Sequence, residues 1–196
     1  MGLSAKITAF LITQNIVPAK DREIYEYGFD LLIADFINFS LILLIGLLHG
    51  QLLKSIIYLI IFVGLRSVCG GYHAKTHLKC HICTISAYIA FLLLQYIFKN
   101  STVVMLCINC IMAIPIILFA PIAHANKPLS PPVYRRNRVL SIIITLGLII
   151  LAALLHCYGC KESIVISLTL WIVSLCMIPA IKPHSFHLIH FRRKRT

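Results

Sequence analysis

Six long apolar runs, separated by short polar segments, constrain this chain more than any other feature. The runs cover approximately residues 31–49, 51–66, 81–98, 101–120, 139–158 and 163–181. Most of them approach the ~20 residues that a helix needs to cross the hydrocarbon core of a bilayer. Because 60% of the residues are hydrophobic and only 12% are charged, too little polar surface remains for a soluble globule of this size. The sequence therefore predicts an all-α fold, a polytopic membrane bundle of about six transmembrane helices.

The basic residues are unevenly distributed over the two sides of such a bundle. If successive loops alternate in side, fifteen of the eighteen lysines and arginines fall on one side, and only Lys54, Lys99 and Lys161 fall on the other. Since basic loops remain in the cytoplasm, we expect a multi-pass protein with both termini and the segment 66–80 on the cytoplasmic face. A net charge of +12 also suits nucleic acid, but no stacking platform or basic recognition helix accompanies it, so no nucleic-acid partner is expected.

We expect one integral membrane domain over residues 1–196, with a cytoplasmic segment (1–30), the bundle (31–181) and a basic tail (182–196). The tail is polybasic and suits a bilayer with anionic lipids. Residues 3–17 show helical periodicity and predict an N-terminal amphipathic helix that Pro18 ends. Two locations remain open for this helix: the cytoplasmic leaflet, or the underside of the bundle.

Five of the six acidic residues fall between Asp21 and Asp35. Carboxylates close to a membrane need a partner more than solvated ones do. We therefore expect Glu26 and Asp35 to pair with Arg66 or with the basic loops.

A proline-rich connector is predicted over residues 120–132. Its four prolines fix the backbone without hydrogen bonds, so an extended, semi-rigid segment is expected. Four basic residues are assigned to this loop as candidates for recruiting an acidic substrate, and they are Lys127, Arg135, Arg136 and Arg138. The alternative, that these residues only enforce topology, remains equally open.

The polar interval RSVCGGYHAKTHLKC at 66–80 contains the candidate catalytic residues. Cys80 is a candidate nucleophile, because it lies where water and a peptide can reach it and because nearby cations favour the thiolate. Two histidines are candidate bases: His77 is nearer on a regular helix, and His73 reaches the thiol only if the backbone bends back. Residue types and spacing alone do not choose between them.

The cysteines and histidines of the chain also allow other roles. A zinc site formed by His73, His77, Cys80 and Cys83 is a minor alternative. Structural packing is expected for four cysteines, namely Cys69, Cys107, Cys110 and Cys176. Cys157 and Cys160 would form an external disulfide if the outside is oxidising.

The interval 66–80 resembles the signature of the accessory gene regulator B family. The opening DREIYEYG before the first run and the segment NKPLS at 126–130 extend this resemblance to nearly the whole chain. The resemblance implies a bacterial membrane cysteine endopeptidase with His73 and Cys80 as catalytic residues and Arg66 and Gly71 as supporting positions. We add Glu26 to the supporting residues. Residues 67–76 should then be irregular or re-entrant, so that His73 approaches Cys80.

The resemblance also implies a partner and a reaction. The substrate would be a short precursor (AgrD-like) peptide of a quorum-sensing pheromone, cleaved on its C-terminal side through a thioester on Cys80 and then cyclised to a thiolactone or lactone. No metal or organic cofactor is expected, and a homodimer remains open. The alternative is a non-enzymatic transporter or peptide exporter in which His73 and Arg66 line a pathway. For Arg66, anchoring to lipid headgroups is a further alternative.

Overall fold

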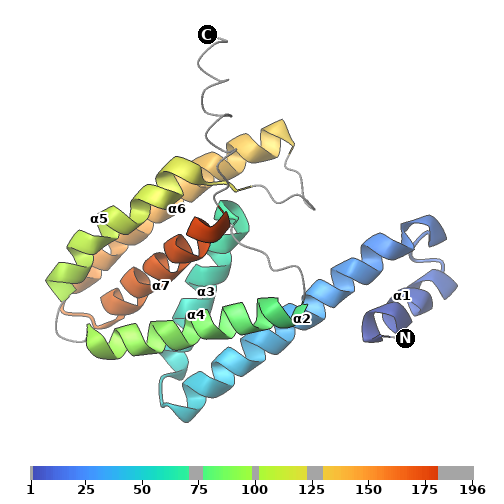
Figure 1. Ribbon diagram of the computed structural model, residues 1–196, viewed down its shortest axis with the longest axis horizontal. Coiled ribbons are helices and arrows are strands. Elements are labelled where there is room, and N and C mark those ends of the chain that lie inside the picture. Colours follow the sequence, from blue (N-terminus) through green and yellow to red (C-terminus); the bar gives the residue numbers. More distant parts are fainter. Residues whose placement is uncertain (1, 71–76, 99–101, 123–129, 181–196) are drawn as a thin grey trace, which may run out of the picture.

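In a computed structural model, the protein is described over residues 2–70, 77–98, 102–122 and 130–180. Within these ranges it consists of helices and contains no β-strand (Figure 1). The helices are α1 (Leu3–Thr13), α2 (Arg22–Leu48), α3 (Leu52–Cys69), α4 (His77–Ile97), α5 (Thr102–Phe119), α6 (Pro131–Cys157) and α7 (Glu162–Met177), with short 3-10 turns η1 (Ala19–Asp21) and η2 (Ile178–Ala180). The all-α class is therefore confirmed.

Five of the described helices, α2, α3, α4, α6 and α7, are long and apolar enough to cross a membrane. The sixth predicted span corresponds to α5, whose described apolar stretch, Val104–Phe119, is shorter. Large apolar side chains such as Ile60, Leu93 and Ile150 point outward and are exposed. An extensive exposed apolar surface suits contact with lipid rather than with water. The architecture is that of a membrane helical bundle.

Two helices begin well before the apolar runs that marked them. α2 begins at Arg22 rather than at residue 31, and α6 begins at Pro131 rather than at residue 139. Hydropathy marks the part of a helix that suits lipid, whereas the polar first turns of both helices lie outside that part. Pro131 and Pro132 fit the start of α6, because the first N–H groups of a helix have no intrahelical partner. The predicted extended connector therefore ends before these prolines.

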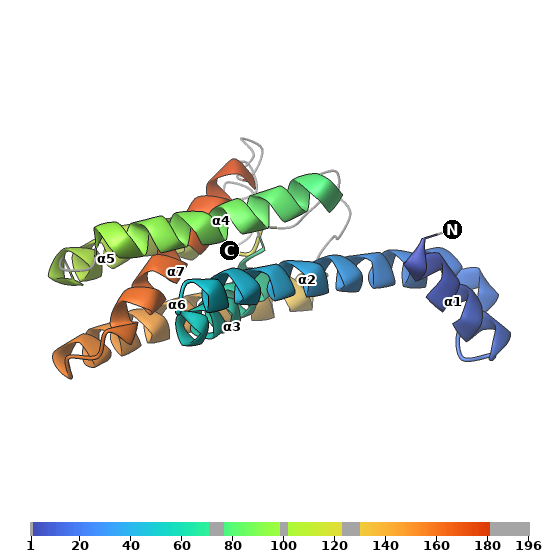
Figure 2. The same ribbon diagram turned by 90° about the horizontal axis from the view of Figure 1, so that it is seen from below.

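The N-terminal helix α1 packs against the N-terminal part of α2, away from the other helices (Figure 2). Ser4, Ala5 and Thr8 form the buried face of α1, whereas the larger Leu3 and Phe10 are exposed. Small side chains thus face α2, and apolar ones remain on the outer face. The helix thus packs on one helix of the bundle and keeps an outer apolar face that suits a membrane surface, so both predicted locations stay open.

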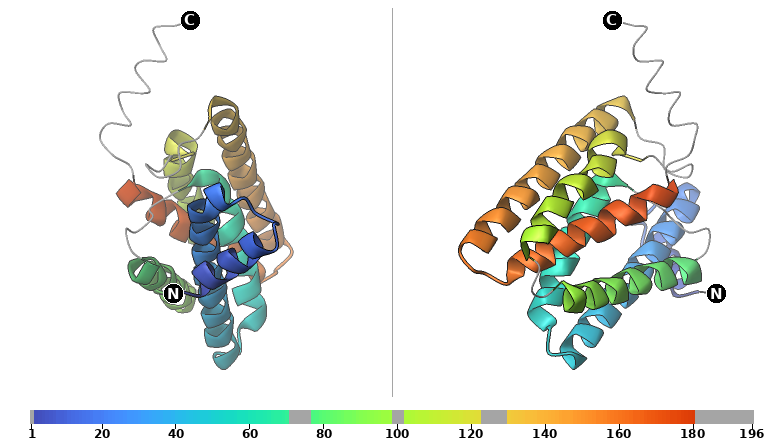
Figure 3. Two further views of the ribbon diagram at one scale, coloured as in Figure 1. Left: turned by 90° about the vertical axis from the view of Figure 1, so that its right-hand side faces the viewer. Right: turned by 60° about the vertical axis from the view of Figure 1, so that its left-hand side comes forward.

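The last helix, α7, lies at the centre and packs against α3, α4, α5 and α6 (Figure 3). All residues from Ser163 to Ser174 are buried, as expected for a helix that is apolar on every side. Asn109 of α5 connects to it by two hydrogen bonds. Its amide nitrogen donates to Ser167 Oγ at 2.8 Å, and its Oδ1 accepts from Trp171 Nε1 at 2.7 Å. The two bonds satisfy the buried amide of Asn109 and the indole N–H of Trp171 in the middle of the bundle.

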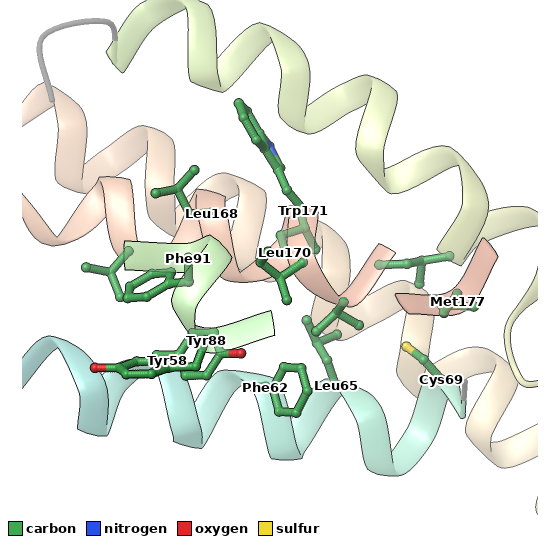
Figure 4. Packing of buried hydrophobic residues seen from close by; sticks show 14 of the residues in the cluster. Tyr58, Phe62, Leu65, Cys69, Tyr88, Phe91, Leu168, Leu170, Trp171 and Met177 are labelled. Atoms are coloured by element: carbon green, nitrogen blue, oxygen red, sulfur yellow. The ribbon is translucent and has the colours of Figure 1, made fainter. Parts of the chain in front are cut away.

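An aromatic cluster joins α3 to α4 (Figure 4). Tyr58 of α3 lies with its ring centroid 4.7 Å from that of Phe91 and 5.2 Å from that of Tyr88, both on α4. Tyr88 also shares a 2.6 Å hydrogen bond with Ser55 of α3. The cluster fixes α4 relative to α3, so that the two helices on either side of the 66–80 interval have a defined arrangement.

Candidate active site

Cys80, the predicted nucleophile, lies near the start of α4 and is a half-buried free thiol. The hydroxyl of Thr84, one helical turn further along, donates a hydrogen bond to its sulfur. Residues four apart share a face of a helix, so Thr84 is placed for this contact by α4 itself. A thiol in this position is partly shielded by the bundle and still open to a reactant.

Arg66 extends from the end of α3 toward the interior of the bundle. Its guanidinium carbon lies 5.6 Å from the centroid of the Phe62 ring, and the guanidinium donates a hydrogen bond to the sulfur of Cys176 on α7. The partial burial of Cys80 disfavours its thiolate, and the positive charge of Arg66 opposes that effect. This position is compatible with the predicted supporting role of Arg66, which stays a prediction.

The third contribution to the site comes from α2. The carboxylate of Asp35 acts electrostatically on Cys80, opposing the effect of Arg66. One turn further along α2, the buried Asn38 Oδ1 lies 2.8 Å from Nδ1 of His81, the residue after Cys80. A carbonyl acceptor at this distance suits the tautomer with the proton on Nδ1. The first turns of α4 are therefore connected to both α2 and α3.

The interruption between α3 and α4 begins at Gly70. This residue has φ +73 and ψ −153, a conformation that side chains with a Cβ rarely adopt. α3 remains helical through Cys69, so the irregular segment predicted at 67–76 starts later than expected. His73 and Gly71 lie outside the described residues, as does the side chain of His77. The approach of His73 to Cys80 therefore stays a prediction.

The connector after α5 contacts the end of α3 directly. The N–H of Ile122 donates to the carbonyl of Cys69 at 2.9 Å, and Ile122 pairs with Gly70 as an isolated parallel bridge. The described part of the proline-rich connector thus lies against the residue where the 71–76 segment begins.

Within the part of the chain that the structure describes, Glu26 pairs with Arg22 and not with Arg66. Its carboxylate forms an ion pair with Arg22, one turn earlier on α2, at 3.7 Å, and both side chains are partly exposed. The acidic patch was not predicted to be helical, but it belongs to α2. Because a helix places residues four apart on one face, Glu26 meets Arg22. Exposed pairs of this kind contribute little to stability.

The basic residues assigned to the proline loop are also placed differently. Arg135, Arg136 and Arg138 belong to the first turns of α6. Arg138 donates hydrogen bonds to the carbonyls of Leu118 (3.1 Å) and Ala120 (2.5 Å), at the C-terminal end of α5. The last carbonyls of a helix have no intrahelical donor, so Arg138 caps α5. Lys127 lies outside the described residues.

The burial and the contacts of the cysteines differ in part from the prediction. Cys69 is buried as expected, but Cys107 and Cys110 are exposed on α5 rather than packed, because their face of the helix points away from α7. Cys157 and Cys160 are free thiols. Cys176, predicted to be a packing residue, is the partner of Arg66. No local signal connects two residues so far apart in sequence.

Within the described ranges, no group of three or more His, Cys, Asp or Glu side chains is arranged to hold a metal ion. The zinc alternative is not tested by this, since His73 and the side chain of His77 fall outside those ranges.

Comparison with known proteins gives a consistent picture. The sequence model of the family described as Accessory gene regulator B matches residues 4–178. Protein FsrB of Enterococcus faecalis is 31% identical over 99 residues, covering 48% of this chain and 40% of the relative. Accessory gene regulator protein B of Staphylococcus intermedius is 30% identical over 112 residues, covering 56% of this chain and 58% of the relative. The chain therefore spans less than two thirds of the length of these relatives. No solved structure matches the chain.

Proposed function

Because the chain belongs to the accessory gene regulator B family, we propose that it is a membrane cysteine endopeptidase that matures a quorum-sensing peptide. The single observation that carries the proposal is the position of Cys80: a half-buried thiol near the start of a helix, with the Arg66 guanidinium acting on it. The substrate would be a short AgrD-like precursor peptide, as the family resemblance implies.

In the first step, His73 takes the proton of the Cys80 thiol, and the thiolate attacks a backbone carbonyl on the C-terminal side of the precursor. The C–N bond breaks, the proton passes from His73 to the leaving amine, and the C-terminal fragment departs. The N-terminal part of the peptide remains bound to Cys80 as a thioester. Arg66 contributes a positive charge that acts on the Cys80 sulfur and a planar set of donors for carbonyl oxygens.

In the second step, the thiol of a cysteine within the bound peptide attacks the thioester carbonyl. A thiolactone ring forms, and the Cys80 thiol is regenerated. Thioester exchange conserves the activation of the acyl group, so this step requires no external energy source. A serine in place of the peptide's cysteine would give a lactone.

We place both termini and Cys80 on the cytoplasmic side, with the whole chain as one membrane domain. The distribution of lysine and arginine supports this orientation. Five described helices are long enough to cross a membrane, and a sixth crossing by the shorter α5 would return the chain to the side on which it began. Gly71 and Glu26 keep the supporting roles proposed from the sequence.

The test uses the full-length protein in lipid nanodiscs and a synthetic peptide encoded by the small open reading frame adjacent to its gene. We expect Cys80→Ala and His73→Ala to lose cleavage, and the wild type to accumulate a peptidyl adduct on Cys80 that mass spectrometry detects. Cys107→Ala is the matched control, since this cysteine is exposed on α5 and far in sequence from the site. Cleavage that persists in Cys80→Ala, or activity that survives full alkylation of Cys80, overturns the proposal in favour of a non-enzymatic transporter.

A further inference from the structure

A groove of about 320 Å³ lies between α4 and α7. Its α4 wall consists of Cys83, Ser86, Ala87 and Ala90, and its opposite wall includes Ile172 and Cys176. The volume is at the lower end of the range for ligand pockets, which run from ~300 to ~1,000 Å³. The lining is almost entirely apolar.

The sequence of α4 explains why this space stays open. Cys83, Ser86, Ala87 and Ala90 follow the spacing i, i+3, i+4, i+7, so they form one stripe along the helix. All four side chains are small, and they face α7 across the groove. On another face of α4, Tyr88 and Phe91 are fully buried and contact Tyr58 of α3. Small residues therefore leave a gap on one face of α4, and large residues close the other.

The groove lies close to the candidate active site, although neither Cys80 nor Arg66 lines it. Cys83, at one end of it, lies one turn from Cys80 on the same helix. Cys176, in the opposite wall, accepts the hydrogen bond from Arg66, whose charge acts on Cys80. The stripe from Cys83 to Ala90 rises about 10 Å along the helix. An extended peptide advances about 3.3 Å per residue, so the groove is as long as three residues of substrate.

We infer that this groove is a specificity subsite that binds the apolar side chains next to the carbonyl attacked by Cys80. The inference rests on the proposed function and adds to it a chemical requirement on the substrate: large apolar residues within about three positions of the cleavage site. The occupant is a peptide because the groove has apolar walls and one of its lining residues, Cys176, interacts with the Arg66 guanidinium. A peptide offers apolar side chains to the walls and carbonyl oxygens to the guanidinium.

Occupation of the groove also serves the second step of the reaction. An apolar peptide segment packed beside the thioester excludes water from it. Hydrolysis of the thioester would release a linear product, whereas attack by the peptide's own thiol closes the ring. The groove therefore favours cyclisation over hydrolysis.

The experiment fills the groove from the α4 side with Ala87→Leu and Ala90→Leu. Ala153→Leu on α6 is the matched control, because it makes the same change at a partly buried position away from the groove. The full-length protein in nanodiscs is assayed with the synthetic precursor, and with a precursor whose apolar residues near the cleavage site are replaced by alanine. The rate at which iodoacetamide alkylates Cys80, measured by peptide mass spectrometry, reports whether the nucleophile is intact.

We expect KM for the wild-type precursor to rise roughly tenfold or more in the groove variants, which is typical of losing an apolar subsite. The alkylation rate of Cys80 should stay within about twofold of the wild type, since no catalytic group is changed. The alanine-substituted precursor should bind the wild-type protein more weakly than the original precursor does. The groove variants should weaken its binding little further, because the contact between its apolar side chains and the groove is already lost. Ser86→Val, at the exposed edge of the groove, replaces any leucine variant that does not fold.

An unchanged KM in correctly folded groove variants overturns the subsite. A KM that rises equally for both precursors also overturns it, and assigns the groove to a lipid chain or to packing. Failure of the proposed function is recognised separately, because it appears as cleavage that persists in Cys80→Ala, whatever the groove variants do.

Discussion

Replacing Gly70 by alanine should loosen the junction between α3 and the connector that follows α5. The φ of +73 and ψ of −153 at Gly70 define a region that costs an L-residue roughly 1–3 kcal/mol. An added Cβ would also approach the carbonyl of Ile122 more closely than real Cβ atoms approach backbone. The backbone must then shift, which breaks the 2.9 Å hydrogen bond between Ile122 N–H and the Cys69 carbonyl. A hydrogen bond of this kind contributes about 0.5–1.5 kcal/mol.

Together these terms predict a loss of about 2–4 kcal/mol in the free energy of unfolding. Gly64→Ala is the matched control, because it lies on the same helix and its added Cβ would meet no atom within 4 Å. A helical glycine replaced by alanine should stabilise the protein by roughly 0.5–1 kcal/mol. Both variants are measured by reversible denaturation in mixed micelles, followed by helical circular dichroism.

The cleavage rate provides a second measurement. Gly70 begins the interval that carries His73, so its displacement should slow cleavage in molecules that remain folded. Equal stabilities and equal cleavage rates for Gly70→Ala and Gly64→Ala would refute the assignment of a constrained junction at Gly70.

Arg66→Lys should reduce kcat/KM by roughly 10- to 100-fold, because lysine lacks the planar fork of donors, whereas Arg136→Lys on the exposed side of α6 should be nearly silent. Wild-type activity in Arg66→Lys would favour simple anchoring to lipid. Asn109→Leu should destabilise the protein by about 1–3 kcal/mol, since Trp171 Nε1 and Ser167 Oγ lose their buried partner. Denaturation followed by tryptophan fluorescence measures this loss, and an unchanged midpoint would show that the two bonds contribute nothing to stability.

Several features of this protein follow from local sequence. The apolar runs predict a helical membrane bundle, because a backbone in lipid must satisfy its own hydrogen bonds. The glycine pair at 70–71 predicts an interruption of the helix in this region, although the prediction placed its start at residue 67 and α3 continues through Cys69. Charged residues are costly near lipid, so a polar interval between apolar runs, here the one with Cys80, marks a candidate functional site. Each of these inferences depends on residues close together in the chain.

Other features depend on which helix faces meet, and neither hydropathy nor spacing contains that information. The partnership of Arg66 with Cys176 exists because the end of α3 packs against the end of α7. The groove exists because the small stripe of α4 faces α7 rather than lipid. Arg138 caps α5 because α6 begins earlier than its apolar run, which places a guanidinium beside the last carbonyls of the preceding helix.

The exposed cysteines of α5 illustrate the same physical limit. Cys107 and Cys110 belong to a helix that is apolar on all sides, so periodicity does not distinguish its inner face from its lipid face. In water, burial sorts polar from apolar residues and leaves a pattern that can be read. In a bilayer both faces of a helix are apolar, and only the packing of one helix against another decides which cysteine meets protein and which meets lipid.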